Sequence, residues 1–303
     1  MQTPEKGLPA ALAGLSPQQL AGQRVIYSYP GLTPPASLIS LIQHGEAAGV
    51  IFFGQNISSK EQIAAVIQQL DQADASPLNP VQAPLLLMTD QEGGQVRRLG
   101  GRPYLSEKEI GANPLPQAET LATEAGQGAA TNLRGVGMNV NLAPVLDVYR
   151  KAGDFDDQFG RSYSMDPNVV SDLGTRMIQA QQAGGAAATA KHFPGLGAAS
   201  ASQNTDAGPV TLNLSLNTLR TVDEVPFAAA IAAGVKLIMV SGRCTRRWVP
   251  GPLGCRPMSC RANCGADWTS PGSRSPTPWR PGRSALSAQP STGRCAQRWP
   301  AWT

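Results

Sequence analysis

Short apolar runs alternate with longer amphipathic stretches along the first 240 residues. The short runs, which we expect to form buried strands, are 24–29, 49–53, 85–89, 137–142, 186–190 and 235–240. The stretches with helical periodicity are 36–48, 61–73, 117–133, 167–183 and 216–233. A Ser58-to-Glu61 capping box is expected to open the second of these helices. This alternation predicts repeated β-α units around a parallel sheet.

The connection after the first strand decides between two α/β architectures. A doubly wound sheet usually carries a glycine-rich phosphate loop there, whereas this chain has Tyr29-Pro30-Gly31-Leu32. An α/β fold of the (β/α)8 TIM-barrel type therefore fits better. Only about six β-α units are visible, so we expect the barrel to be truncated.

Composition changes abruptly near Ser241. All five Trp and all five Cys lie beyond it, with ten of the 25 basic residues but only one of the 21 acids. The body, 1–241, is therefore acidic, and the overall charge of +4 describes neither part. We expect 1–241 to be an incomplete catalytic barrel and 242–303 to be an out-of-frame tail that is disordered or non-native.

The basic tail does not indicate a nucleic-acid partner. Its arginines are scattered among nine prolines without helical or alternating periodicity. Its cysteines offer one CxxxC pair, at Cys260 and Cys264, without a nearby His, which is a poor match to a zinc site. We expect no metal.

The N-terminal residues 1–6 lack a basic-then-apolar signal segment, and no apolar run approaches the length of a membrane span. We expect a chain that is cytoplasmic as written, and one that is exported or lipid-anchored if an upstream leader has been lost. The oligomeric state is left open.

Polar residues follow the ends of the predicted strands. They are Asp90, Asn141, Asp147, the Lys191-His192 pair and Ser241. A barrel gathers the carboxyl ends of its strands on one face, where enzymes of this fold keep their active sites.

Two motifs carry the most specific signal. Residues 191–197 read Lys-His-Phe-Pro-Gly-Leu-Gly, and residues 89–98 read Thr-Asp-Gln-Glu-Gly-Gly-Gln-Val-Arg-Arg. Glycine and proline allow tight turns beside a ligand, while Lys, His and Asp offer groups that bind hydroxyls. Taken alone, the Lys191-His192 pair also fits a structural ion pair, and Asp90 also fits a solvated acid beside a turn.

Together these motifs resemble glycoside hydrolase family 3, in its β-N-acetylglucosaminidase branch. The segments Ala-Pro-Val-Leu-Asp-Val at 143–148 and Gly-Arg-Ser-Tyr-Ser at 160–164 match further motifs of that family in the same order. The resemblance implies that the N-acetylglucosamine unit is held by Asp90, Arg98, Arg161, Lys191 and His192. Asp147 fits an anchor of the barrel rim better than a sugar ligand.

The chain departs from the family pattern at three places. Gln95 replaces an Arg, and Leu196 replaces the second His of the KHFPGHG motif. The family's Asp-Ser-His acid/base loop becomes Asn204-Thr205-Asp206, as in an actinobacterial-type subgroup that it resembles. Asp206 is then the candidate acid/base, provided that burial raises its pKa.

The family's nucleophile is the Asp of a Thr-Asp-Ala-Leu-like segment ending the seventh strand, and nothing after Ser241 matches it. However, the codons for residues 267–282 can be chosen, within the genetic code, so that a shifted reading frame contains the missing segment. When the bases are read in triplets that start at the third base of the first codon, they can encode Leu-Asp-Phe-Pro-Gly-Val-Thr-Ile-Thr-Asp-Ala-Leu-Glu-Ala-Gly. The Asp codon then spans Pro276 and Thr277. One base lost shortly after Ser241 accounts for the tail.

The function that follows is hydrolysis of terminal, non-reducing β-N-acetylglucosamine from cell-wall muropeptides or chitin oligosaccharides. The mechanism is retaining, without a metal or organic cofactor, and impaired in this chain because the nucleophile is missing. Three alternatives stay open: a non-catalytic sugar-binding remnant, an unfolded frameshift product, and a β-glucosidase or xylosidase of the same family.

Overall fold

A computed structural model describes residues 14–81, 83–205, 207–208 and 210–245 of the protein. They belong to one compact unit that ends at Thr245. The predicted tail from residue 246 onward and the candidate acid/base Asp206 lie outside the described residues.

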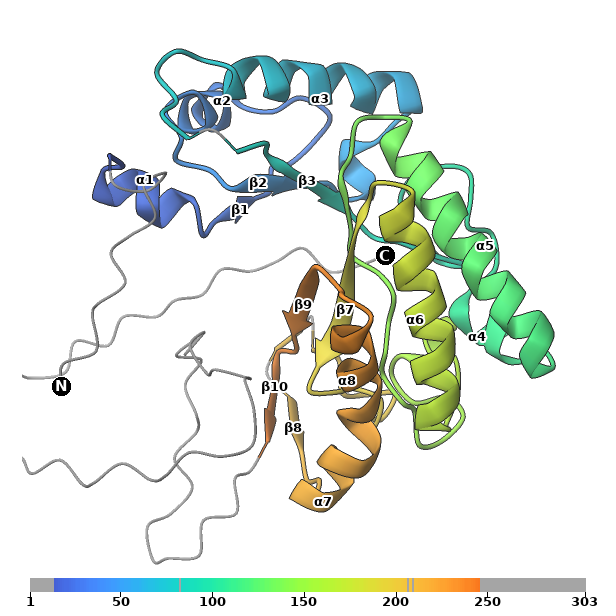
Figure 1. Ribbon diagram of the computed structural model, residues 1–303. Helices are drawn as coiled ribbons and strands as arrows, with labels where there is room; N and C mark the ends of the chain where they lie inside the picture. Colours follow the sequence, from blue (N-terminus) through green and yellow to red (C-terminus); the bar gives the residue numbers. More distant parts are fainter. Residues whose placement is uncertain (1–13, 82, 206, 209, 246–303) are drawn as a thin grey trace, which may run out of the picture. The chain divides into compact units, whose positions relative to one another are not determined.

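The unit is built on a sheet of six parallel strands in the order β1-β2-β3-β6-β7-β9 (Figure 1). The strands are β1 (Ile26–Tyr27), β2 (Gly49–Ile51), β3 (Leu86–Thr89), β6 (Val140–Asn141), β7 (Ala187–Phe193) and β9 (Leu237–Val240). Each lies within or overlaps one of the six predicted apolar runs. The strands follow chain order, which is the topology of a barrel wall rather than of a doubly wound sheet.

One helix precedes the first strand, and the others lie between successive strands of the main sheet. They are α1 (Pro17–Gly22), α2 (Ala36–Gln43), α3 (Lys60–Asp74), α4 (Glu107–Gly111), α5 (Leu115–Arg134), α6 (Pro167–Ala183), α7 (Leu216–Thr218) and α8 (Val225–Ala232). Short 3₁₀ turns lie at Gly54–Asn56 and Asp157–Phe159, and a π turn at Leu219–Asp223 joins α7 to α8. The single helix predicted over 216–233 is thus interrupted by this π turn.

The start of α3 corrects one prediction. The N-cap is Ser59, whose side chain accepts a hydrogen bond from the backbone amide of Gln62 at 3.1 Å. The N-cap therefore lies one residue later than predicted, and the predicted Ser58-to-Glu61 capping box is wrong. Ser58 instead donates its backbone amide to the side-chain oxygen of Gln62, so both serines use the same glutamine.

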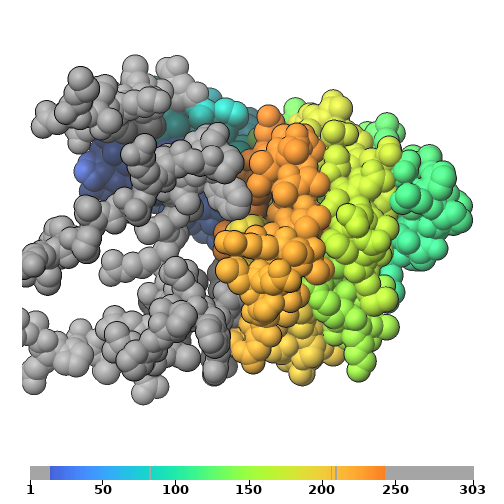
Figure 2. Space-filling model, turned by 60° about the horizontal axis from the view of Figure 1, so that its bottom comes forward, coloured from blue at the N-terminus to red at the C-terminus, as the bar shows by residue number. Residues whose placement is uncertain are grey.

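The sheet separates two apolar layers, because alternate residues of a strand point to opposite faces. Toward the helices, Val50 and Leu87 pack with residues of α2 and α3, while Ala188 and Ala190 pack with residues of α6 and α8. The orange residues of α8 lie beside those of α6 in Figure 2. On the opposite face, a smaller cluster forms what would be the barrel interior. Its members are Met88, Val140, Leu142, Ile51, Leu86, Ala187, Leu237 and Met239.

Two small sheets lie outside the main sheet. β4 (Gln91–Gly93) and β5 (Val96–Arg97) form an antiparallel hairpin directly after β3. β8 (Val210–Leu212) pairs in parallel with β10 (Arg243–Thr245), which follows β9. Neither pair was predicted, because all four of these strands lie outside the six apolar runs in which strands were expected. No helix in the described part of the chain is long and apolar enough to span a membrane.

Candidate active site

The hairpin after β3 is shaped by its two glycines. Gly93 and Gly94 have φ values of 122° and 54°, a region that residues with a side chain rarely adopt. A Cβ at Gly93 would lie 2.1 Å from the carbonyl oxygen of Leu105. The hairpin base is fixed by Asn141, whose side-chain amide exchanges two 3.0 Å hydrogen bonds with the backbone of Gln91. The Asp-Gln-Glu-Gly-Gly motif is thereby held rigidly at the end of the strand.

Lys191 is the centre of the polar cluster at the carboxyl ends of the strands. It is buried near the end of β7, and its Nζ lies 2.7 Å from Oδ1 of Asp90 and 2.6 Å from Oε1 of Glu92. Burial alone would lower the pKa of this ammonium group, but the two carboxylates raise it above its usual value. Lys191 is therefore charged and joins β7 to the segment that follows β3.

Arg161 is held from two sides. Its Nε and one terminal nitrogen each donate to Glu92 at 2.9 Å, and its other terminal nitrogen donates to Oδ1 of Asp156 at 3.0 Å. Burial of Glu92 favours its neutral form, but the charges of Arg161 and Lys191 outweigh burial and lower the Glu92 pKa to about 2. Glu92 is thus a carboxylate shared between two cations, which fixes the planar guanidinium in one orientation.

His192 is oriented by Asp147. Its Nδ1 lies 2.6 Å from Oδ2 of Asp147, and the fully buried Asp147 also accepts a hydrogen bond from the backbone amide of Leu196. Burial opposes ionisation of Asp147, but the His192 charge and these hydrogen bonds lower its pKa. Asp147 therefore anchors the Lys-His-Phe-Pro-Gly-Leu segment.

Asp156 completes this end of the cluster as a second buried acid beside Asp147. Burial raises the pKa of Asp156 to about 7, and the Asp147 carboxylate adds to the shift. Asp147, Asp156 and His192 each offer a ligand atom, and these atoms lie within 4.8 Å of one another, a spacing that could hold a metal ion. Those atoms already bind Arg161 and one another, so a cation would have to displace existing contacts.

Glu107, the first residue of α4, lies behind the cluster. It is buried, and its Oε1 accepts a hydrogen bond from the backbone amide of Val145 at 2.8 Å. Burial raises the pKa of Glu107 well above its usual value, and the nearby Glu92 charge adds to the shift. The surroundings of this side chain therefore favour its neutral form.

The structure brings together four of the five predicted sugar-binding residues: Asp90, Arg161, Lys191 and His192. The fifth, Arg98, donates its backbone amide to the carbonyl oxygen of Asp90 at 3.1 Å, so its backbone lies directly beside the cluster. Asp90, Arg161 and His192 keep 13–15% of their side-chain surface exposed, whereas Lys191 keeps 2%. The first three are the groups that a ligand can reach.

Sequence reasoning missed the roles of Glu92, Asp156 and Glu107. Glu92 stands inside a motif that had been singled out, next to Asp90, yet its burial between two cations cannot be inferred from spacing. Asp156 lies in an acid-rich run, 154–157, shortly before Arg161. This run of acids was the sequence feature that could have indicated an ion pair with Arg161, because neighbouring buried carboxylates usually need a cation to compensate their charge.

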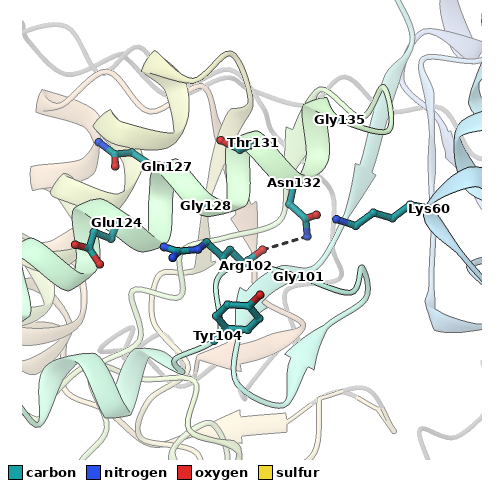
Figure 3. A pocket seen from close by; sticks show the side chains of 10 residues that line it. All are labelled: Lys60, Gly101, Arg102, Tyr104, Glu124, Gln127, Gly128, Thr131, Asn132 and Gly135. Carbon is teal, nitrogen blue, oxygen red and sulfur yellow. Dashed lines mark hydrogen bonds between the residues drawn. The ribbon is translucent and has the colours of Figure 1, made fainter.

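A surface cavity lies outside this cluster. It is lined by α5 residues between Glu124 and Asn132, by Gly135 just after that helix, by Gly101, Arg102 and Tyr104 of the loop before α4, and by Lys60 (Figure 3). The side-chain amide of Asn132 donates to the carbonyl oxygen of Arg102 at 3.1 Å across its floor. None of the residues of the Asp90–Lys191 cluster lines this cavity, so it is a weaker candidate for chemistry than the strand ends.

An acid- and base-rich cluster at the carboxyl ends of sequential parallel strands is typical of barrel enzymes. The chain matches the glycosyl hydrolase family 3 N-terminal domain over residues 19–257, and it belongs to that family. This finding confirms the predicted family and the glycoside hydrolase class.

Curated relatives agree with the match. An "Uncharacterized secreted glycosyl hydrolase" of Arthroderma benhamiae is 44% identical over 234 residues, which cover 77% of this chain and 64% of that protein. A "Beta-hexosaminidase" of Xylella fastidiosa is 34% identical over 229 residues, covering 74% of this chain and 65% of that protein. The chain thus spans slightly less than two thirds of the length of these relatives.

Solved structures agree with the fold. The family 3 β-N-acetylglucosaminidase of a Paenibacillus species superposes with a TM-score of 0.67 at 31% identity, covering 76% of this chain and 43% of that one. A β-N-acetylhexosaminidase of Beutenbergia cavernae gives a TM-score of 0.64 at 29% identity, with coverages of 75% and 68%. These similarities confirm the predicted barrel-type α/β fold, of which residues up to Thr245 form six parallel strands.

Proposed function

We propose that the barrel to which this chain belongs hydrolyses terminal, non-reducing β-N-acetylglucosamine residues of cell-wall muropeptides or chitin oligosaccharides. The observation that carries the proposal is the position of Lys191, whose ammonium group joins Asp90 and Glu92 at the carboxyl ends of the strands. The relatives named beta-hexosaminidase support the same substrate class.

The four clustered residues divide the work of holding the sugar. Asp90, partly exposed and fixed by Lys191, offers a carboxylate that can accept hydrogen bonds from hydroxyls. Arg161 and His192 add two further polar side chains to the cluster, each oriented by a buried acid. Because Glu92, Asp156 and Asp147 hold these donors in place before a ligand arrives, binding costs little additional side-chain entropy.

The proposed reaction is retaining. Asp206 donates a proton to the leaving oxygen while a second carboxylate attacks the anomeric carbon from the opposite face, and water then releases the sugar with Asp206 as base. The second carboxylate would come from the Thr-Asp-Ala-Leu segment encoded in the shifted frame. The chain as translated lacks that segment, so we expect it to bind sugar without appreciable turnover.

The test restores the reading frame by inserting one base after the Ser241 codon and assays the product on aryl β-N-acetylglucosaminide and aryl β-glucoside. We expect hydrolysis of the N-acetyl substrate with retention of configuration. A preference for the glucoside would overturn the substrate assignment and favour the β-glucosidase alternative. Hydrolysis by the 303-residue chain at the same rate as the repaired chain would overturn the role of the missing nucleophile.

A direct binding measurement separates the remaining alternatives. Calorimetric titration of the 303-residue chain with N-acetylglucosamine should give saturable binding that is lost in Asp90→Ala. A chain that shows no cooperative thermal transition would instead support the unfolded-product alternative.

A further inference from the structure

Phe159 is an exposed aromatic residue in the connection from the carboxyl end of β6 to α6. It ends the 3₁₀ turn Asp157–Phe159, just before Arg161 in the chain. Phe159 is 40% exposed, whereas Phe155 beneath it is 5% exposed. The connections at the carboxyl ends of the strands form the face where barrel enzymes keep their active sites. Because covering an exposed apolar surface is favourable, a ligand that packs on this ring gains affinity.

One backbone carbonyl holds Phe159 and Arg161 together. The carbonyl oxygen of Asp156 accepts a hydrogen bond from the backbone amide of Phe159 at 3.2 Å and from that of Arg161 at 3.1 Å. Gly160 between them has a φ of 70°, which lets the chain reverse within this short turn. The Asp156 carboxylate also accepts a hydrogen bond from the Arg161 guanidinium at 3.0 Å. Phe159 is therefore fixed next to a residue of the proposed sugar site.

The ring of Phe159 rests on Phe155. The two ring centroids lie 5.8 Å apart with an angle of 81° between the planes, which is an edge-to-face arrangement. Phe155 in turn packs with Leu196 and Ala199, and its backbone amide donates to the carbonyl oxygen of Ala199 at 2.8 Å. The exposed ring is thus supported from below by a buried apolar cluster.

The same turn contacts the loop that leads to the proposed acid/base. The side-chain amide of Gln158 donates to the carbonyl oxygen of Ala201 at 3.3 Å. Ala201 belongs to the loop that continues along the chain to Asp206. In a glycosidase the general acid protonates the oxygen that joins the terminal sugar to the next unit. The turn that carries Phe159 is therefore bonded to Arg161 on one side and to the acid/base loop on the other.

The chemistry of a β-linked glucosamine unit suits an aromatic neighbour at this place. Its hydroxyl and N-acetyl groups lie around the rim of the ring, so that C–H groups cover both faces. Such a face packs on the electron-rich face of an aromatic ring. Among the exposed large apolar side chains of the described residues, Tyr104 is the other aromatic, and it lines the separate cavity over α5. Phe159 is the one that lies beside the polar cluster.

We propose that Phe159 is the platform for the second sugar unit of the substrate, and that it selects a β-linked disaccharide or longer glycan over N-acetylglucosamine itself. The terminal unit lies against Asp90, Arg161 and His192, and the C–H face of the next unit packs on Phe159. Phe159 takes no part in breaking the bond and determines specificity only. The inference rests on the proposed function, because it takes the Asp90–Lys191 cluster as the site of the terminal unit.

The experiment compares N-acetylglucosamine with N,N′-diacetylchitobiose by calorimetric titration of the 303-residue chain. The parent should bind the disaccharide about fivefold more tightly than the monosaccharide. Phe159→Ala should remove that advantage and leave the affinity for the monosaccharide within about twofold. A loss of structure around Arg161 would instead weaken the binding of both sugars.

Two further variants and a matched control complete the series. Phe159→Tyr keeps the aromatic ring and should bind both sugars like the parent. Phe159→Leu keeps an apolar side chain without a flat face and should bind like Phe159→Ala. Tyr104→Ala removes an aromatic side chain that is 63% exposed in the separate cavity, and it should leave both affinities unchanged. If Phe159→Ala lacks a cooperative thermal transition, the Tyr and Leu variants provide the same comparison.

Three results would overturn the role of Phe159. They are equal affinity of the parent for the two sugars, equal weakening of both sugars in Phe159→Ala, and an equal loss of disaccharide binding in Tyr104→Ala.

The platform and the proposed function fail separately. If Asp90→Ala abolishes monosaccharide binding but the parent binds the disaccharide no more tightly, the platform is overturned and the function stands. If disaccharide binding depends on Phe159 but not on Asp90, the assignment of the terminal-sugar site is overturned and the platform stands. A folded parent chain that binds neither sugar overturns both.

Discussion

Lys191 places its Nζ 2.7 Å from Oδ1 of Asp90, a residue 101 positions earlier in the chain. The same ammonium group lies 2.6 Å from Glu92, so one cation neutralises two carboxylates on the segment after β3. A buried ion pair of this kind is costly to break from one side, because the remaining charges lose their compensation. Lys191→Met should therefore destabilise the protein by about 3–5 kcal/mol and abolish binding of N-acetylglucosamine.

Chemical denaturation and calorimetric titration measure these two effects. Lys236→Met, which removes an exposed lysine just before β9, is the matched control and should change neither. A Lys191→Met chain as stable as the parent would contradict the central position assigned to this residue.

Glu92 and Glu107 form a second matched pair, since both are buried but their pKa values are shifted in opposite directions. Glu92 is ionised, with its pKa lowered to about 2, and Glu92→Gln should cost about 3–5 kcal/mol because Arg161 and Lys191 lose their shared partner. The pKa of Glu107 is raised, which favours its neutral form, so Glu107→Gln should cost less than about 1.5 kcal/mol. Urea unfolding at pH 7 compares the two variants, and equal losses would refute the assignment of charge.

Asp156 makes the stability depend on pH in a definite direction. Its pKa is raised to about 7 in the folded protein, so between about pH 4 and pH 7 the folded state holds a proton that the unfolded state has released. Asp156 therefore destabilises the folded protein least at low pH, and its contribution to the free energy of unfolding falls as the pH rises from about 4 to about 7.

Asp156→Asn removes this titration while keeping an oxygen for the hydrogen bond from Arg161. The unfolding free energy of the variant relative to the parent should increase from pH 4.5 to pH 8, by more than about 1 kcal/mol. Thermal melts across that range measure the difference. A difference that is flat with pH, or that decreases, would show that Asp156 is ionised throughout.

Leu196 differs from the His of the family motif for a reason visible in the packing. It is 1% exposed and packs in a small cluster with Phe155, Ala199, Val210 and Leu212. Leu196→His should lower the free energy of unfolding by about 1–3 kcal/mol, because it buries a polar imidazole among apolar side chains. Leu196→Met, which keeps an apolar side chain of similar size, should lower it by less than about 1.5 kcal/mol. Denaturation midpoints of both variants provide the measurement.

The reading-frame hypothesis is tested on the DNA itself. Sequencing the codons for residues 241–247 should show one base fewer than in close relatives. Relatives that carry the same Trp-, Cys- and Arg-rich tail in frame would refute it.

The sequence alone determined the order of the six strands, because each is a short apolar run between helical segments and consecutive β-α units pack side by side. It also determined the family, since several motifs agreed in order, and it marked Asp90, Lys191, His192 and Arg161 as one site. The small strands β4, β5, β8 and β10 left no periodic signal.

Only the tertiary structure decided which acids partner which bases. Asp90 and Glu92 against Lys191, Glu92 against Arg161, and Asp147 against His192 are contacts between residues 45 to 101 positions apart in the chain. Their charge states follow from burial and from neighbouring charges, which depend on how β3, β6 and β7 lie side by side rather than on spacing. The exposure of Val240 and Ile238 is likewise a property of the sheet, because a strand becomes an edge only when its neighbour is missing.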